Sequence, residues 1–467
     1  MVGAGLCGLS TALLLGADGH DVVVLERDPA PPPATAEAAW QAWERRGVNQ
    51  FRFLHMFGSR WCQIVDRELP EVAAALEGAG GLRTNPLIGV PEQMSGGWRD
   101  GDERYELLTG RRPVVEAALA GVAARAARVE VRRGVAVAGL RTGVPTSDGI
   151  PHVTGVRTTS GEDVDGDLLV DAAGRRSPLP AWLAAIGARP PVEEVEASGI
   201  VYYGRYFCSA DRSIPPFLGS AIQHYDSVTT VTLPADNGTW GVGMGISGAD
   251  GDLRRLGDPD TWMRVARSYP MIAHWLDGEP IDQGPDVMAK LEDRRRRLVV
   301  DGRPVATGVV AVGDSWACTN PSLGRGASMG LVHAETLRDH LRAGPTDDPL
   351  ASALAWDQAT DRAVGGWYRD TRTFDRHRLA EMAAQIEGRR YRPADPAWSN
   401  IRSLERAAPL DPDVLRAYVR VITVQETTEE VLAQPGIGAA VAEKGAGWED
   451  DVAPGPSRPE LLAIVKG

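Results

Sequence analysis

The chain has 467 residues, 43% hydrophobic and 24% charged, a composition typical of a globular protein with two or three domains. Its net charge of -13 argues against nucleic acids and anionic membrane surfaces as partners, because like charges repel. No apolar run approaches the roughly 20 residues of a membrane span. The cysteines lack metal-ligand spacing and indicate a reduced, cytoplasmic setting without a metal site: Cys7, Cys62, Cys208 and Cys318.

The first 26 residues have the pattern of a dinucleotide-binding unit. Three glycines open a helical stretch, and the β-favouring run 22–25 leads into Glu26; the glycines are Gly3, Gly5 and Gly8. Glycines let the backbone approach a pyrophosphate at the helix N-terminus, and an acid about 20 residues on accepts ribose hydroxyls. A secretory signal is the rival interpretation, but no lysine or arginine precedes the apolar stretch. Only Met1 and Val2 precede the first glycine, which leaves open whether the native chain starts upstream.

The order of elements along the chain favours interleaved domains. A Pro-rich loop at 29–33 is followed by helical patterns at 55–80 and 112–127, an antiparallel excursion at 129–142 and 151–158, and a buried strand at 168–170. Residues 199–247 are β-rich with several aromatics, and a further apolar strand covers 308–312. We expect 351–467 to be mostly helical, with a loose tail from about 445.

In the β-rich region, three glycines share one face of the expected strand: Gly241, Gly243 and Gly245. A bare face of this kind indicates close approach by a ligand or by other protein atoms. The packing interpretation is the preferred one, and the aromatics at 202, 203, 206 and 240 are expected to belong to the core.

Strand ends near residues 2, 170 and 312 each lead into glycine and charge. With the segments 167–177 and 313–328, the glycine turn resembles the three FAD motifs of the group A flavoprotein monooxygenases, which have the para-hydroxybenzoate hydroxylase fold. The resemblance spans most of 1–345. It implies an α/β fold: a Rossmann-like FAD-binding domain of glutathione-reductase type (1–180 and 295–350), an interleaved β-sheet substrate domain (181–294) and a C-terminal helical region (351–467).

The resemblance also implies which residues bind FAD. Glu26 would hold the adenosine ribose, Asp314 the ribityl hydroxyls, and the turn that follows would face the flavin's pyrimidine edge. The expected cofactor-binding set is Gly3, Gly5, Gly8, Glu26, Arg27, Arg112, Asp314, Gly324, Gly326 and Ala327. Arg112 is preferred to its neighbour Arg111, which is interpreted as solvated. A simple helix cap is the alternative role for Asp314.

Three further side chains are candidates near the flavin: Arg52, His55 and Arg325. Gln50, Arg52 and His55 lie in a segment similar to one that passes close to the flavin in an epoxidase-like branch of the family. An ordinary packed histidine is the competing interpretation of His55. Arg325 either adds positive charge beside the flavin, or points to solvent or pairs with a carboxylate.

Departures from the common aromatic-hydroxylase pattern favour the epoxidase and hydroxylase branch of natural-product pathways. Ala173 stands where many members have aspartate, Ala317 where histidine is common, and Ser328 where asparagine is common. The first of these positions is linked in the family to nicotinamide binding as well as to FAD. Direct use of NADPH is therefore in doubt.

The implied function is insertion of one oxygen atom from O2, by hydroxylation or epoxidation through a flavin C4a-hydroperoxide, into a hydrophobic aromatic or polyketide-like small molecule. The electrons would come from NADPH or NADH, directly or through a flavin reductase. Three alternatives compete with this function: a dehydrogenase or reductase of the same fold, a non-catalytic flavin-binding protein, and a flavin halogenase. The halogenase is disfavoured because no lysine precedes Lys290 and no Trp-x-Trp-x-Ile-Pro segment occurs.

Overall fold

A parallel sheet lies at the centre of the first domain in the computed structural model, which describes residues 1–344, 348–451 and 453–467. Val2 bridges two strand pairs, so the sheet order is β4, β1, Val2, β8, β19. The strands are β1 (Val22–Glu26), β4 (Val129–Arg133), β8 (Leu169–Asp171) and β19 (Val309–Ala311). The chain therefore starts in the middle of the sheet and winds outward in both directions, as the Rossmann-like expectation requires.

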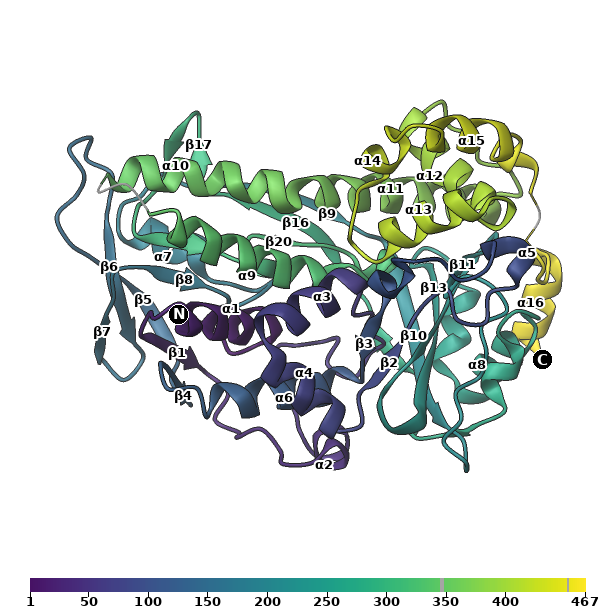
Figure 1. Ribbon diagram of the computed structural model, residues 1–467, viewed down its shortest axis with the longest axis horizontal. Helices are drawn as coiled ribbons and strands as arrows, with labels where there is room; N and C mark the ends of the chain where they lie inside the picture. The colour runs from purple at the N-terminus through teal and green to yellow at the C-terminus, as the bar shows by residue number, and fades with distance from the viewer. Residues whose placement is uncertain (345–347, 452) are drawn as a thin grey trace.

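Helices cover this sheet (Figure 1), and α1 and α9 pack against each other. Leu9, Ala12 and Leu14 of α1 are buried in the shared core. The helices of this region are α1 (Leu6–Ala17), α2 (Ala36–Gln41), α6 (Arg112–Ala123), α7 (Leu179–Ala185), α9 (Gly326–Arg342) and α10 (Pro349–Thr360). This arrangement confirms the predicted α/β fold class.

The single helical stretch expected at 55–80 is wrong in one respect, because it is two helices after an irregular start. The helices are α3 (Ser59–Glu68) and α4 (Pro70–Gly78). Pro70 lacks the N–H that would continue α3, so it ends one helix and occupies the first turn of the next. Residues 55–58, before α3, form irregular chain.

The antiparallel excursion is confirmed for 137–142 and 153–158, which form a small sheet of β5 (Val137–Thr142), β6 (Val153–Thr158) and β7 (Asp163–Asp165). This small sheet forms the left edge of the molecule in Figure 1. The expectation is wrong for 129–133, because this segment is β4 and pairs in parallel with β1 in the central sheet. The shorter elements are β2 (Leu82–Thr84), β3 (Leu107–Thr109), β17 (Val299–Val300), β18 (Arg303–Pro304) and α5 (Glu92–Ser95), the last of which packs against the C-terminal helices.

A second sheet is antiparallel and carries the predicted aromatic core. Its main strands run in the order β11, β12, β13, β10, β14, with β15 also pairing with β10. Their bounds are β10 (Ile200–Cys208), β11 (Ile222–His224), β12 (Val228–Pro234), β13 (Thr239–Ser247), β14 (Glu279–Pro280) and β15 (Asp286–Met288). One face is covered by α8 (Pro259–Arg267), and a small sheet of β9 (Val192–Ala197), β16 (Glu292–Arg297) and β20 (Ala317–Cys318) leads back to the first domain.

The glycine face of β13 is a packing surface, as expected. A Cβ on Gly241 would lie 2.4 Å from Leu54, and one on Gly243 would lie 2.8 Å from Val231. At the third glycine, Gly245, the nearest side chain is Tyr202, 3.0 Å away. The bare face therefore admits the segment that carries Leu54 rather than a ligand.

The C-terminal region is helical, and its end is not the loose tail that the sequence suggested. The helices are α11 (Gly366–Ile386), α12 (Pro396–Ala407), α13 (Pro412–Ile422), α14 (Thr428–Leu432), α15 (Ile437–Lys444) and α16 (Arg458–Lys466). Leu461 and Val465 of α16 are buried among the residues of α8 and the second sheet. Apolar packing therefore fixes this helix to the β-rich domain, beside α8 in Figure 1. None of the helices in the described part of the chain combines the length and apolar character that a bilayer crossing requires.

Candidate functional site

The glycine turn after Val2 combines two tightly packed glycines with one that faces open space. A Cβ on Gly3, whose φ is +100°, would lie 2.5 Å from the Ala172 carbonyl oxygen, and one on Gly8 would lie 2.1 Å from that of Gly3. Nothing lies within 4 Å of a Cβ built on Gly5. Gly5 is the N-cap of α1 and has no side-chain cap, so the first N–H groups of this helix are available to an anion.

Glu26 begins a chain of buried ion pairs below this turn. Its carboxylate accepts hydrogen bonds from the Ala4 N–H at 2.8 Å and from Arg45 Nη2 at 2.8 Å. Arg45 Nη1 also donates to Glu116 Oε2 at 2.8 Å. Arg45 and Glu116 were missed by the sequence reasoning, because nothing local marks two residues 71 positions apart as partners.

Arg112 continues this chain of charges towards His55. Its Nε donates to Glu116 Oε1 at 2.7 Å, and its Nη1 donates to His55 Nε2 at 3.0 Å. His55 Nδ1 donates to the Phe53 carbonyl oxygen at 2.9 Å, so the ring is neutral. Burial and the charge of Arg112 lower the pKa of His55 to about 3. His55 is thus a neutral, doubly held imidazole and does not act as an acid at neutral pH.

Asp314 follows β19 at the same edge of the sheet. Burial raises its pKa, while the neighbouring charges of Arg112 and Arg175 favour the ionised form. Arg112 comes from α6 and Arg175 from the second motif, so residues from three distant segments surround this carboxyl group. Among the described residues, only the Cys318 thiol is placed to donate to it. Its oxygens can therefore accept hydrogen bonds from a ligand.

The second motif is tied to the third by Ser315. Its hydroxyl accepts from the Gly174 N–H at 2.8 Å and donates to Asp171 at 3.2 Å. Asp171 also accepts from the Ala173 N–H and from the Ser177 hydroxyl, so its carboxylate is fully engaged. Asp171 therefore holds the two strand ends in register.

The third motif is a glycine turn that leads into α9. Gly324 adopts φ +64°, and a Cβ there would lie 3.0 Å from Met56. Gly326 begins the 17-residue helix, and nothing lies within 4 Å of its added Cβ. The Gly58 N–H donates to Ser328 at 3.1 Å, so the segment after His55 is fastened to this turn. Ala327 is partly buried next to the open position.

Two predicted residues lie away from this cluster. Arg27 is exposed and donates to the Arg46 carbonyl oxygen at 3.3 Å. Arg52 donates to the Trp43 carbonyl oxygen at 3.2 Å, with its guanidinium 5.3 Å from the Trp40 ring centroid. The structure does not bring Arg52 to Asp314, and its place near a flavin stays a prediction.

Arg111 is not solvated, which corrects the interpretation made from the sequence. It is 2% exposed and forms a bidentate pair with Asp236, its Nη2 lying 2.7 Å from Oδ2. Asp236 is completely buried and lies at the end of β12. The pair therefore joins the start of α6 to the second sheet, while Arg112 turns to His55.

A cavity of about 1430 Å³ lies between the second sheet, the loop around α5 and the C-terminal helices. Met56 and Phe57 line it on the side of the third motif, and Leu218, Tyr418 and Ile422 are among its other walls. This volume exceeds the 300–1,000 Å³ of ordinary small-molecule sites. The cavity is large enough for a bulky, mostly apolar compound.

Two buried carboxyl groups meet at Asn320, just before the third-motif turn. Asp293 accepts from the Asn320 backbone N–H at 2.8 Å, and Asp375 accepts from its side-chain Nδ2 at 3.0 Å. Burial and the charge of Asp293 raise the pKa of Asp375 well above its usual range. Burial likewise raises the pKa of Asp293.

This pair predicts a pH dependence of stability. A raised pKa means that the carboxyl group of Asp375 holds its proton more tightly in the folded chain than in the unfolded chain. The stabilisation of the fold that this proton provides is therefore lost as pH rises above about 4. Asp375→Asn keeps an acceptor for Asn320 but has no proton to lose. We expect its stability relative to the wild type to rise between pH 5 and 8, by up to about 1.4 kcal/mol per pH unit of the titration window. Urea unfolding at both pH values measures this difference, with the exposed Asp21→Asn as control, and parallel pH profiles for Asp375→Asn and wild type would contradict it.

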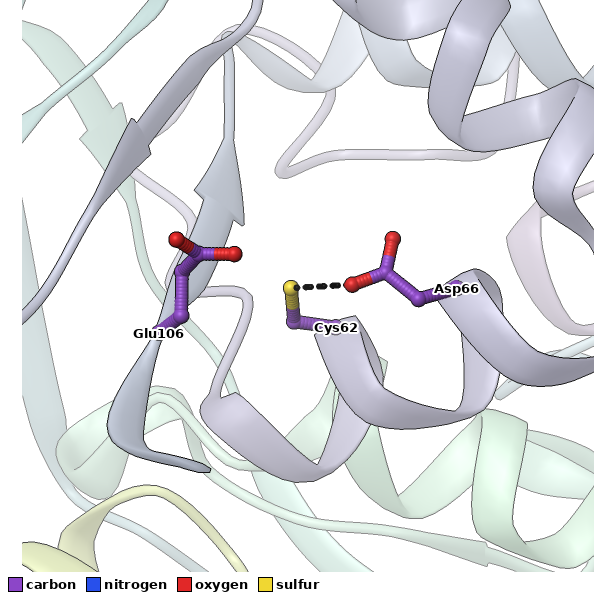
Figure 2. A group of neighbouring side chains, drawn as sticks. All are labelled: Cys62, Asp66 and Glu106. Atoms are coloured by element: carbon purple, nitrogen blue, oxygen red, sulfur yellow. Dashed lines mark hydrogen bonds between the residues drawn. The ribbon is translucent and has the colours of Figure 1, made fainter. Parts of the chain in front are cut away.

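One group of potential metal ligands occurs among the described residues, formed by Cys62, Asp66 and Glu106 (Figure 2). Arg83 lies among them, 2.6 Å from Asp66 and 2.8 Å from Glu106. Burial raises the pKa of the Cys62 thiol to about 12, whereas a metal ligand must be a thiolate. The negative charge of this group is thus already balanced by Arg83, and the group forms an ion-pair network.

Comparisons with known proteins agree with the observed fold. Residues 1–46 match the family model of an NAD(P)-binding Rossmann-like domain. A Mycobacterium tuberculosis protein, Rv3254, is 26% identical over 474 residues, which covers 96% of this chain and 94% of its own length.

Two solved structures are similar throughout most of the chain. One is pqsL, described as a probable FAD-dependent monooxygenase from Pseudomonas aeruginosa, with a TM-score of 0.58 and 16% identity over 83% of this chain and 98% of its own. The other is the flavin-dependent brominase Bmp2, with a TM-score of 0.59 and 16% identity over 90% of this chain and 92% of its own. The chain therefore has the fold shared by these flavoproteins.

Proposed function

We propose that this chain is an FAD-dependent monooxygenase that hydroxylates or epoxidises a hydrophobic aromatic or polyketide-like small molecule. The observation that carries the proposal is the meeting of three strand ends at one edge of the sheet. Each strand end brings one part of the site to this edge: Gly5 with the N-terminus of α1, Gly174, and Asp314 with the start of α9. In a sheet of this topology, that edge is where ligands bind.

The residues present fit FAD. Space beside Gly5 and Gly326 would accept a pyrophosphate and a flavin edge at two helix N-termini. Glu26 retains acceptor capacity for ribose hydroxyls, and Asp314 has carboxylate oxygens without a backbone or charged donor. When bound, FAD would supply the redox chemistry that activates O2.

The chain's own contribution is binding, orientation and exclusion of water. The large cavity starts at Met56, which touches Gly324 of the third motif, so a compound in the cavity would lie beside the expected flavin position. Apolar walls shield a reactive centre from water and hold the compound in place. Arg112 provides a fixed cationic donor, and neutral His55, whose only N–H is taken by the Phe53 carbonyl oxygen, holds that arginine without a mobile proton at neutral pH.

Halogenation is the less favoured alternative, although the brominase likeness keeps it relevant. The first lysine, Lys290, is exposed and lines a shallow groove with Arg175 and Arg294 rather than the large cavity. A dehydrogenase reaction without oxygen insertion is decided by the labelling experiment below.

The source of electrons is also part of the proposal. The groove beside the second motif, of about 360 Å³, is lined by five cationic side chains and one carboxylate, Glu292, which pairs with Arg294; the cations are Arg175, Arg176, Lys290, Arg294 and Arg296. Such a groove suits the phosphates of NADPH or NADH, so we propose direct reduction, with a separate flavin reductase as the alternative. The four free cysteines support a cytoplasmic location.

The test begins with the purified chain, which should be yellow, with absorbance near ~450 nm from oxidised flavin. Anaerobic addition of NADPH then shows whether reduction is direct. Admission of heavy oxygen gas with candidate aromatic and polyketide substrates should give a labelled product. A colourless protein that FAD does not restore would contradict cofactor binding, and turnover without label would favour the dehydrogenase.

Asp314→Ala is expected to weaken FAD binding by about 10- to 100-fold, because hydrogen bonds to a charged group contribute ~1.5–3 kcal/mol. Flavin fluorescence during reconstitution measures the Kd. Asp165→Ala, in the distal β7 strand, is the control and should bind FAD like the wild type. Retention of wild-type affinity in Asp314→Ala would remove Asp314 from the cofactor site.

A further inference from the structure

Arg325 is a buried cation with unused donors. It is the N-cap of α9, between Gly324 and Gly326, and is 5% exposed. Its Nε and Nη1 have no hydrogen-bond partner. An unpaired buried guanidinium is costly, since charge taken from water needs compensation. A ligand that accepts hydrogen bonds from this guanidinium would offset the cost of burying it.

The surrounding side chains do not supply that compensation. Trp367 lies under the guanidinium at 5.0 Å, which is a cation–π contact without hydrogen bonds. The charges of Asp370 and Asp375 act on the Arg325 guanidinium, but neither carboxyl group forms an ion pair with it within 4.0 Å in the described part of the chain. Burial also raises the pKa of both carboxyl groups, so each holds a proton more readily than an exposed aspartate does.

Arg325 lines a small cavity that adjoins the large one. The small cavity is about 50 Å³, and both cavities share walls that include Met56, Ser220, His224 and Tyr418. The small cavity therefore lies directly beside the large one, on the side of the third-motif turn, and we call it the inner end of the cavity. Two arginines of the large cavity already use their terminal nitrogens, because Arg402 Nη1 pairs with Glu405 at 2.7 Å and Arg378 Nη2 donates to backbone carbonyls.

We propose that Arg325 binds an anionic oxygen of the substrate, either a carboxylate or an ionised phenol or enol, at the inner end of the cavity. The inference rests on the proposed function, because it assumes that the large cavity holds the substrate. A guanidinium offers several fixed donors and matches an anionic oxygen better than a neutral one, above all where water is scarce. Since Arg325 belongs to the turn expected to face the flavin, the acidic end of the substrate is anchored beside the reacting centre.

Binding of small probes tests the proposal without turnover. Isothermal titration of the full chain as purified compares 2-naphthoate with 2-naphthamide, and ionised 4-nitrophenol with 4-nitroanisole. The wild type should bind at least one anion about 10-fold or more tightly than its neutral partner. Arg325→Gln should lose this preference. Arg390→Gln is the matched control, because Arg390 lines the same cavity but is exposed and paired with Asp450.

The outcomes separate the possible roles of Arg325. A lost preference with an unchanged or raised Tm in Arg325→Gln supports ligand binding, because removal of an unpaired charge does not cost stability. The proposal is wrong if the wild type shows no preference for either anion, because water would then be the only partner of Arg325. It is also wrong if the preference for an anion survives in Arg325→Gln. The anion that responds identifies the chemical class. The FAD content of the same preparations is recorded separately, so failure of the proposed function and failure of this inference are distinguishable.

Discussion

Gly8→Ala should leave little folded protein. The added methyl would lie 2.1 Å from the Gly3 carbonyl oxygen, a backbone atom in the centre of the sheet. Gly3 cannot move away easily, because its N–H donates to Leu25 and the preceding residue is paired with β8. Such a clash costs more than the ~1–3 kcal/mol of ordinary overpacking. Thermal unfolding and the yield of folded chain measure the effect.

Gly5→Ala is the matched variant, expected to fold normally but bind FAD poorly. Gly5 has φ −85°, which alanine adopts without strain, and its added methyl meets no atom within 4 Å. The methyl would instead occupy the space at the N-terminus of α1, so the affinity for FAD should fall about 10-fold or more. Equal stability of Gly8→Ala and wild type would contradict the turn geometry. If Gly5→Ala binds FAD with unchanged affinity, the pyrophosphate does not bind at the N-terminus of α1.

The edge of the sheet where the three motifs meet was predictable because parallel strands end side by side. The sequence shows glycine and charge after each of three apolar runs, and the topology then brings Gly3, Gly174 and Asp314 together. Some errors were avoidable. Pro70 marked a break within 55–80, and Ser457 with Glu460 form a capping box that predicts α16.

Other features depended on long-range packing that no local pattern reveals. Arg111 and Arg112 are adjacent in sequence but point to different partners, because α6 begins between them. The Arg325 guanidinium lies over Trp367, which comes from a helix that begins 41 residues after this position. Such side chains lie where the two domains and the helical region converge, so their roles follow from tertiary structure alone.

The buried chain of charges from Glu26 to His55 gives the second large expected effect. Arg45 is 8% exposed and is the shared partner of Glu26 and Glu116, both of which are buried. Arg45→Met would remove the cation that they share, which leaves Glu26 with backbone N–H donors and Glu116 with Arg112. Removal of one partner from a buried pair costs ~3–5 kcal/mol, which is a large part of the stability of a typical domain.

Urea unfolding of Arg45→Met should therefore show a midpoint far below that of the wild type, while the exposed neighbour variant Arg46→Met should stay within about 0.5 kcal/mol. Adding Glu116→Gln to Arg45→Met removes one of the two carboxylates that lost Arg45 as a partner. The double variant should therefore regain part of the lost stability, as expected for residues that interact directly. Strictly additive losses would mean that Arg45 and Glu116 act independently. If Arg45→Met loses no more stability than Arg46→Met, water or rearranged backbone donors compensate the buried charges. The proposed electrostatic link between the glycine turn and His55 would then be wrong.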